Sequence, residues 1–128
     1  KLLGKKAGKG FYVHSKEGKV VNTELEPASD NTAINDFEVL DRAILMMVNE
    51  AAMCVDEGMI DKPEYLDMAM IMGTGFPPFR GGLLRYADSI GIAKVVERLK
   101  ELEGKYGIRF KPAAILERMA ASNQKFYK

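Results

Sequence analysis

The chain has 128 residues, 47% hydrophobic and 29% charged, a composition typical of one globular core that needs no metal or disulfide. Its 19 basic and 18 acidic side chains leave a net charge of +1, so no global field attracts nucleic acid or an anionic membrane. The single cysteine, Cys54, excludes an intramolecular disulfide, and no apolar run approaches the roughly 18 residues of a membrane span. We therefore expect an intracellular protein without membrane insertion and without a signal peptide.

Residues 1–30 are rich in Gly, Lys and small polar residues and predict an irregular tail and linker. The glycine-rich start is not a Walker A loop, because one residue too few separates Gly4 from Gly8, and Gly10 stands where Ser or Thr is required. The only histidine, His14, lies beside this tail, which argues against a nucleophilic catalytic site. One His and one Cys give no closed metal site, so we predict neither a catalytic residue nor a metal ligand.

A helical period begins near Asn35 and continues to Gly58, a residue type that suits a helix end. Apolar residues recur there at helical spacing and predict one buried face: Phe37, Leu40, Ile44, Leu45, Val48, Ala51, Ala52 and Val55. Asp61 is expected to cap a second helix, with Pro63 in its first turn and Glu64 completing a capping box. The expected buried stripe of this second helix is Tyr65, Met68, Ala69 and Met72.

Residues 73–82 read GTGFPPFRGG and predict an ordered, irregular loop, since two prolines remove backbone donors and four glycines permit positive φ. A short helix over residues 83–90 follows, and Gly91 separates it from a fourth helix. The inner face of that fourth helix is expected to be Ile92, Val95, Val96, Leu99 and Leu102. A last helix is expected from Pro112 to about Ser122. Five helices without an alternating strand pattern predict an all-α fold.

Asp41 is the polar exception on the first helix, because it falls near the centre of the predicted apolar face. A buried carboxylate needs a cation or several hydrogen-bond donors. Asp41 is therefore either part of a structural ion pair or helix-capping contact, or a remnant of a substrate-binding position.

The loop from Phe76 to Gly82 also leaves two interpretations open. We favour a packed corner that orients two helices and buries Phe76 and Phe79. In the other interpretation the glycines expose backbone N–H groups at a helix start, where Arg80, Arg85 and Lys94 would help to bind a phosphate such as that of coenzyme A.

Several stretches together resemble one known family. They are residues 40–52 (LDRAILMMVNEAA), 73–82 (GTGFPPFRGG) and 84–88 (LRYAD), with residues 8–12 (GKGFY) similar to the end of a preceding dehydrogenase half-domain. In this helical context they resemble the last domain of the α subunit of multifunctional β-oxidation enzymes, in the 3-hydroxyacyl-CoA dehydrogenase family. The resemblance implies that residues 1–30 are the tail of the preceding helical domain and a linker. Residues 31–128 would then form a second, five-helix 3-hydroxyacyl-CoA dehydrogenase C-terminal-like domain.

Proteins of this kind carry an enoyl-CoA hydratase region, an NAD-binding Rossmann domain and two helical domains in tandem. The resemblance implies that the complete enzyme oxidises a 3-hydroxyacyl-CoA with NAD, using a His and a Glu of the Rossmann domain, which is not in this chain. In the catalytic helical copy, Asn precedes the Arg of the first long helix. Here Asp41 precedes Arg42, which argues that this copy is not catalytic.

We therefore expect a non-catalytic domain that imitates within one chain the dimer contact of simpler relatives and is inactive alone. The implied partners are the Rossmann, helical and hydratase domains of the parent chain, a thiolase β subunit and the acyl-CoA substrate. No cofactor is expected in this chain, while NAD is expected in the parent enzyme. The location would be cytoplasmic in a bacterium, and mitochondrial or peroxisomal in a eukaryote. The alternative is an acyl-CoA-binding or homodimerising helical module.

Binding or interface residues are expected on the first helix and at the loop. They are Asp41, Arg42, Asn49, Glu50, Phe76, Pro77, Pro78, Phe79, Arg80, Gly81, Gly82 and Arg85.

Overall fold

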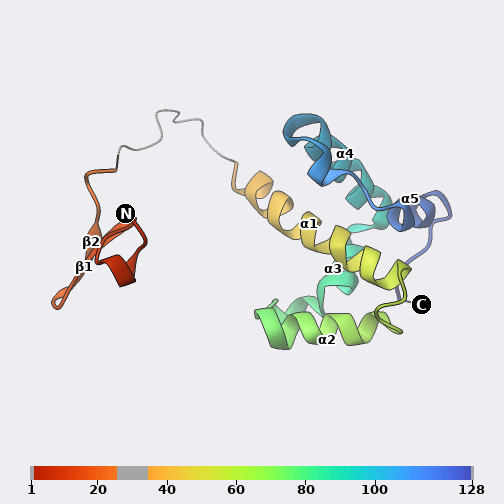
Figure 1. Ribbon diagram of the computed structural model, residues 1–128. Coiled ribbons are helices and arrows are strands. Elements are labelled where there is room, and N and C mark those ends of the chain that lie inside the picture. Colours follow the sequence, from red (N-terminus) through yellow and green to blue (C-terminus); the bar gives the residue numbers. More distant parts are fainter. Residues whose placement is uncertain (1, 26–34, 128) are drawn as a thin grey trace. The chain divides into compact units, whose positions relative to one another are not determined.

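The computed structural model describes residues 2–25 and 35–127 and divides the chain between residues 33 and 34 into two compact units (Figure 1). We call residues 1–33 the N-terminal unit and residues 34–128 the helical unit, and each is described by itself. No helix in the described ranges is both long and apolar enough to cross a membrane.

The N-terminal unit contains a short 3-10 helix, η1 (Lys5–Ala7), and an antiparallel hairpin of β1 (Tyr12–Ser15) and β2 (Gly18–Val21). Buried Asn22 ties the hairpin to the glycine-rich start, because its side-chain amide donates to the carbonyl of Gly10 at 2.9 Å. The hairpin was not predicted, and the expectation of an irregular tail is wrong here. The reason is that β2 is exposed on both faces, so its sequence has no period of two to detect.

Over residues 35–127 the helical unit contains five α-helices and two 3-10 helices, in agreement with the five-helix prediction (Figure 1). They are α1 (Asp36–Asp56), α2 (Pro63–Thr74), η2 (Pro78–Arg80), α3 (Leu83–Ile90), α4 (Ile92–Tyr106), η3 (Ile108–Phe110) and α5 (Ala114–Ala121). The all-α fold predicted from the sequence is confirmed.

The core lies where α1, α3, α4 and α5 meet. Its largest fully buried side chains are Phe110, Leu45, Leu83, Leu84, Leu99, Leu116, Val48 and Val95. The predicted inner face of α4 is buried throughout. In α2, by contrast, the only buried residues are Leu66 and Asp67, so that helix lies at the margin of the core.

The predicted buried face is wrong at the start of α1. Phe37 is 78% exposed and Leu40 58% exposed, whereas burial begins at Leu45. Asn35 caps α1 by accepting the backbone N–H of Phe37 at 3.0 Å, so the helix starts before it reaches the core. The first two turns of α1 therefore present apolar side chains outward.

The predicted face and cap of α2 are also wrong. Tyr65, Met68 and Met72 are 59%, 60% and 78% exposed, and Ala69 is exposed as well. The N-cap residue is Lys62, which makes no side-chain capping bond, so Asp61 forms no capping box. Because α2 is apolar on more than one face, its sequence period does not identify the face that packs.

Candidate functional site

The loop between α2 and α3 folds into a corner. Gly75 ends α2 in the left-handed conformation, with a φ of 74°, and the chain then forms η2. Phe76 is buried and its ring centroid lies 6.2 Å from that of Tyr86 on α3, but Phe79 is 82% exposed. The prediction that the corner buries both phenylalanines is therefore correct for Phe76 and wrong for Phe79.

A buried carboxylate from α2 occupies the N-terminus of α3. Asp67, only 3% exposed, accepts the backbone N–H groups of Leu84 at 2.7 Å and Arg85 at 3.1 Å. Gly82 is required beside it, because a Cβ at that position would lie 2.2 Å from the Asp67 Cβ. The sequence suggested that backbone N–H groups at this helix start could bind a phosphate. These N–H groups instead donate to the Asp67 carboxylate of the chain itself.

Both arginines of the corner stack on aromatic rings of this chain. The Arg80 guanidinium carbon lies 5.4 Å from the ring centroid of Tyr86, and that of Arg85 lies 3.9 Å from the ring centroid of Tyr127. Gly81 leaves room for this arrangement, since a Cβ there would lie 2.5 Å from the Arg85 Cδ. These contacts hold the two guanidinium groups against the protein surface.

The C-terminal residues complete the corner. The Tyr127 hydroxyl donates to Asp67 Oδ2 at 2.6 Å, while Asp88 of α3 accepts the backbone N–H groups of Phe126 and Tyr127 at 3.0 and 2.9 Å. Burial and the hydrogen bond to the Asp67 carboxylate raise the pKa of Tyr127 well above its ordinary value. Asp88 therefore fixes residues 126 and 127 to α3, and Asp67 links Tyr127 to α2.

Asp41 forms the structural ion pair considered from the sequence. Its Oδ1 lies 3.1 Å from Nη1 of Arg98 on α4, and about a third or less of each side chain is exposed. The neighbouring Arg42 contacts a different residue of α4, with its guanidinium carbon 4.2 Å from the ring centroid of Tyr106. Tyr106 and Lys105 also hydrogen-bond to Glu38 and, in that order, lower the pKa of the Glu38 carboxyl.

Asn49 is a structural link between α1 and the segment before α5. It is 6% exposed, its Nδ2 donates to the carbonyl of Lys111 at 3.0 Å, and its Oδ1 accepts the N–H of Ala113 at 2.7 Å. Both groups of its side-chain amide are therefore engaged with backbone groups of the helical unit.

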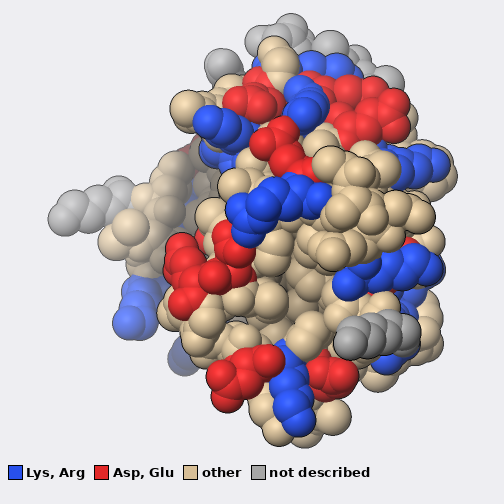
Figure 2. Space-filling model, turned by 90° about the vertical axis from the view of Figure 1, so that its right-hand side faces the viewer, with Lys and Arg blue, Asp and Glu red and all other residues tan. Residues whose placement is uncertain are grey.

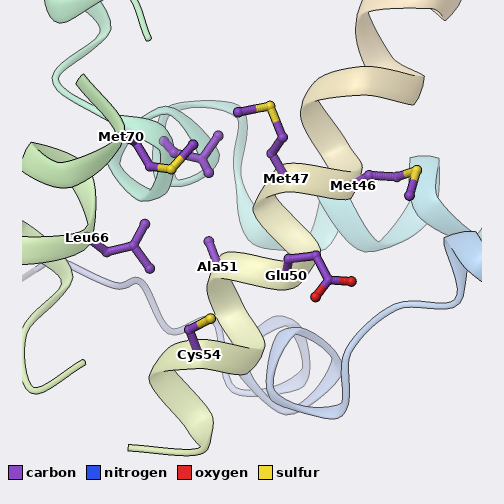
Figure 3. Close-up of a pocket in the computed structure, with 8 residues that line it drawn as sticks. Met46, Met47, Glu50, Ala51, Cys54, Leu66 and Met70 are labelled. Carbon is purple, nitrogen blue, oxygen red and sulfur yellow. The ribbon is translucent and has the colours of Figure 1, made fainter. Parts of the chain in front are cut away.

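Glu50 lies at the edge of an apolar groove between α1 and α2, with a cavity volume of about 410 Å³ (Figure 3). The groove is lined by Met46, Met47, Glu50, Ala51, Cys54, Leu66, Met70 and Leu83. Figure 3 shows Met46 and Glu50 on the side of α1 that faces away from Leu66 and Met70 of α2. The groove therefore has apolar walls and a single carboxylate at its outer edge.

The expected site residues thus lie in three separate places rather than in one. Asp41 and Arg42 contact side chains of α4, Asn49 and Glu50 are neighbours on α1 that point about 100° apart, and the loop residues lie at the corner. The sequence analysis did not identify Asp67 as a buried residue. The only hint of its burial is that this aspartate stands between two apolar residues, Leu66 and Met68. The sequence analysis also missed Asp88 and Tyr127, for which no local pattern exists, because their partners lie far away along the chain.

Charge is evenly mixed on the surface. Figure 2 shows basic and acidic side chains interspersed over the described residues of one face, without an extended area of one sign there. This agrees with the net charge of +1. That face therefore offers no broad electrostatic surface for a polyanion.

Comparison with known proteins identifies similar sequences. A model of the family described as 3-hydroxyacyl-CoA dehydrogenase, C-terminal domain, matches residues 39–128. Proteins named fatty acid oxidation complex subunit alpha are 44% identical over 133 residues in Shewanella amazonensis, 43% over 128 in Vibrio cholerae and 38% over 127 in Vibrio vulnificus. Each comparison covers 97% of this chain but 18% of the relative, so the chain spans less than a fifth of these proteins.

Proposed function

Because this chain belongs to the family of 3-hydroxyacyl-CoA dehydrogenase C-terminal domains, we propose that it acts as a non-catalytic structural domain of a fatty-acid oxidation complex α subunit. The complete polypeptide would hydrate enoyl-CoA and oxidise 3-hydroxyacyl-CoA with NAD in other domains. Its location would be cytoplasmic, and a thiolase β subunit would be its partner. The helical unit would support a neighbouring helical domain of the same polypeptide, in place of a dimer partner.

The observation that carries this proposal is the internal use of polar side chains, two of them buried and one half-buried. Asp67 binds the start of α3, Asn49 binds the backbone before α5, and Asp41 pairs with Arg98 of α4. A carboxylate or amide that is satisfied inside the domain is not oriented toward a substrate. Such groups fix the arrangement of the helices, which is what a supporting domain requires.

The outward face of α2 supplies a surface for the neighbouring domain. Tyr65, Met68 and Met72 are all more than half exposed on this helix. Aromatic residues and Met are enriched where proteins contact one another, and a cluster of exposed apolar residues marks such a contact. We infer that this face packs against the neighbouring helical domain.

A chimera tests the proposal. The matching stretch of the Shewanella amazonensis subunit is replaced by this chain, and oxidation of 3-hydroxybutyryl-CoA with NAD is measured together with thermal stability. The variant Met68→Ser/Met72→Ser should lower both, because it weakens the docking of the domain. The matched control Ala93→Ser/Ala114→Ser, at exposed positions of α4 and α5, should change neither.

Two results would contradict the proposal. If Asp41→Ala abolished turnover of the chimera without changing its thermal stability, Asp41 would have a catalytic role. If the Met68→Ser/Met72→Ser chimera matched the unsubstituted chimera in stability and activity, the outward face of α2 would not be a docking surface. The unsubstituted 128-residue chain alone should not turn over any acyl-CoA.

A further inference from the structure

After α5 the chain turns back across the helical unit. Asn123 adopts the left-handed conformation, with a φ of 52°, and in residues 2–25 and 35–127 no other residue except glycine has a positive φ. The backbone N–H of Gln124 donates to the carbonyl of Met119 at 2.8 Å and completes a helix-ending turn around Asn123. We call residues 123–127 the strap, because they leave α5 at this turn and reach other helices.

The strap is fastened to both α2 and α3. Asp88 of α3 accepts the backbone N–H groups of Phe126 and Tyr127, and the Tyr127 hydroxyl donates to Asp67 of α2. The Tyr127 ring also stacks on the guanidinium of Arg85, a second residue of α3. Because Tyr127 contacts both helices, a closed strap links α2 to α3.

The link is important for α2 because this helix has few other buried attachments. Its only buried residues are Leu66 and Asp67. The Asp67 Oδ1 atom accepts the N–H of Leu84, while Oδ2 accepts both the N–H of Arg85 and the Tyr127 hydroxyl. The strap therefore supplies one of the three donors that hold this carboxylate at the start of α3.

The core of the helical unit does not depend on the strap. Its buried apolar residues all lie between residues 45 and 119, and the strap adds only half-buried Phe126 and Tyr127. Phe126 lines a hollow of about 320 Å³ together with Val55 of α1 and Met119 of α5. A segment that has few buried contacts can open locally while the rest of a domain remains folded.

We propose that the strap opens and closes while the core stays folded, and that its opening loosens α2 from the start of α3. In the closed state the strap helps to hold the Asp67 carboxylate against the backbone N–H groups of Leu84 and Arg85. In the open state Tyr127 leaves Asp67, and the hollow beside Met119 is uncovered. The position of α2 then depends on the strap, whether or not the outward face of α2 contacts another domain.

Amide hydrogen exchange of the 128-residue chain, followed by NMR, tests the opening. The N–H groups of Phe126 and Tyr127 should exchange at least about a hundredfold faster than that of buried Leu99, because the strap opens without global unfolding. The N–H groups of Leu84 and Arg85 exchange only when Asp67 withdraws, so their exchange should depend on urea in the same way as that of the strap. Equal exchange rates for the strap and for Leu99 would overturn the proposal.

Two substitutions separate opening of the strap from a general loss of stability. Asn123→Ala should speed exchange in the strap and at the start of α3 by about fivefold, because alanine adopts the left-handed conformation less readily than asparagine. The matched control is Gln124→Ala, at the exposed neighbouring position, which should change neither rate. Leu102→Val, in the part of the core beside the start of α1, should speed exchange at Leu99 but not in the strap.

A thiol probe tests whether opening uncovers the hollow. In a Cys54→Ser background, Met119→Cys places a thiol beside Phe126, and adding Asn123→Ala should speed its reaction with a soluble disulfide by about fivefold. Circular dichroism confirms that each variant is folded. If Asn123→Ala sped exchange in the strap but not at the start of α3, the strap would not be coupled to α2 and the proposal would be wrong. A thiol reaction rate that Asn123→Ala left unchanged would also contradict it.

Discussion

Replacing Asp67 by Ala tests whether this buried carboxylate holds the helical unit together. The substitution removes the acceptor of two backbone N–H groups at the start of α3 and of the Tyr127 hydroxyl. It creates no steric conflict, because Ala is smaller than Asp. Its effect therefore reports the three hydrogen bonds and the charge.

The magnitude follows from the contacts. Loss of a helix N-cap costs about 0.5–2 kcal/mol. A tyrosine hydroxyl left without its acceptor costs about 1–3 kcal/mol more. The substitution also removes a buried charge, whose desolvation opposes folding, so the net loss lies toward the lower end of this range. We expect the free energy of unfolding to fall by about 2–3 kcal/mol, a large fraction of the roughly 5–15 kcal/mol of an ordinary domain.

Equilibrium unfolding in urea, followed by circular dichroism, measures this change. The matched control is Asp61→Ala, which removes the exposed aspartate that the sequence predicted as a cap and should change stability by less than about 0.5 kcal/mol. Tyr127→Phe should lose its effect in the Asp67→Ala background, because the hydrogen bond between the two residues is then already absent. An Asp67→Ala variant as stable as the control would refute the reasoning.

Three further results are expected. The pKa of the Tyr127 hydroxyl is raised in the folded protein, so its contribution to stability is complete below the unfolded pKa of 10.0 and is lost as the pH rises above that value. Between about pH 8 and pH 11 the melting temperature of Tyr127→Phe should therefore fall less than that of the unsubstituted chain. The exposed control Tyr65→Phe should behave like the unsubstituted chain. Asn49→Ala should lower the free energy of unfolding by about 2–4 kcal/mol, because a backbone N–H and carbonyl lose their partners, whereas the neighbouring Glu50→Ala should have little effect in dilute solution. Calorimetry with acetyl-CoA should show no heat of binding at the corner, because Asp67 occupies the start of α3, and saturable binding that Arg80→Ala abolishes would contradict this explanation.

The helix boundaries could be predicted to within about two residues because local signals determine them, although the cap of α2 is Lys62 and not Asp61, and α5 begins at Ala114 and not at Pro112. Gly58 and Gly75 adopt positive φ angles of 69° and 74° after α1 and α2, and Pro63 stands in the first turn of α2. Backbone conformation of this kind depends on the residue at the position and not on distant partners. The five helices were therefore predicted correctly.

The buried face of α2 could not be predicted, because tertiary contacts decide it. Tyr65, Met68 and Met72 have the correct helical spacing and are nevertheless exposed, whereas Asp67 is buried. Burial of Asp67 depends on the N–H groups of Leu84 and Arg85, which lie 17 and 18 residues further along the chain. The sequence of α2 contains no information on the position of those donors. From hydrophobicity alone, an aspartate is predicted to be exposed.

The polar contacts of the helical unit share one structural role. Each joins two different segments: Asp67 joins α2 to α3, Asn49 joins α1 to the start of α5, and Asp88 joins α3 to the chain end. Apolar packing is non-directional and tolerates small shifts of one helix along another, whereas a hydrogen bond at 2.7 Å to a particular backbone N–H fixes the register of both. Buried polar residues in such a domain are therefore explained by positioning, and the outward faces of α1 and α2 remain available for contact with other surfaces.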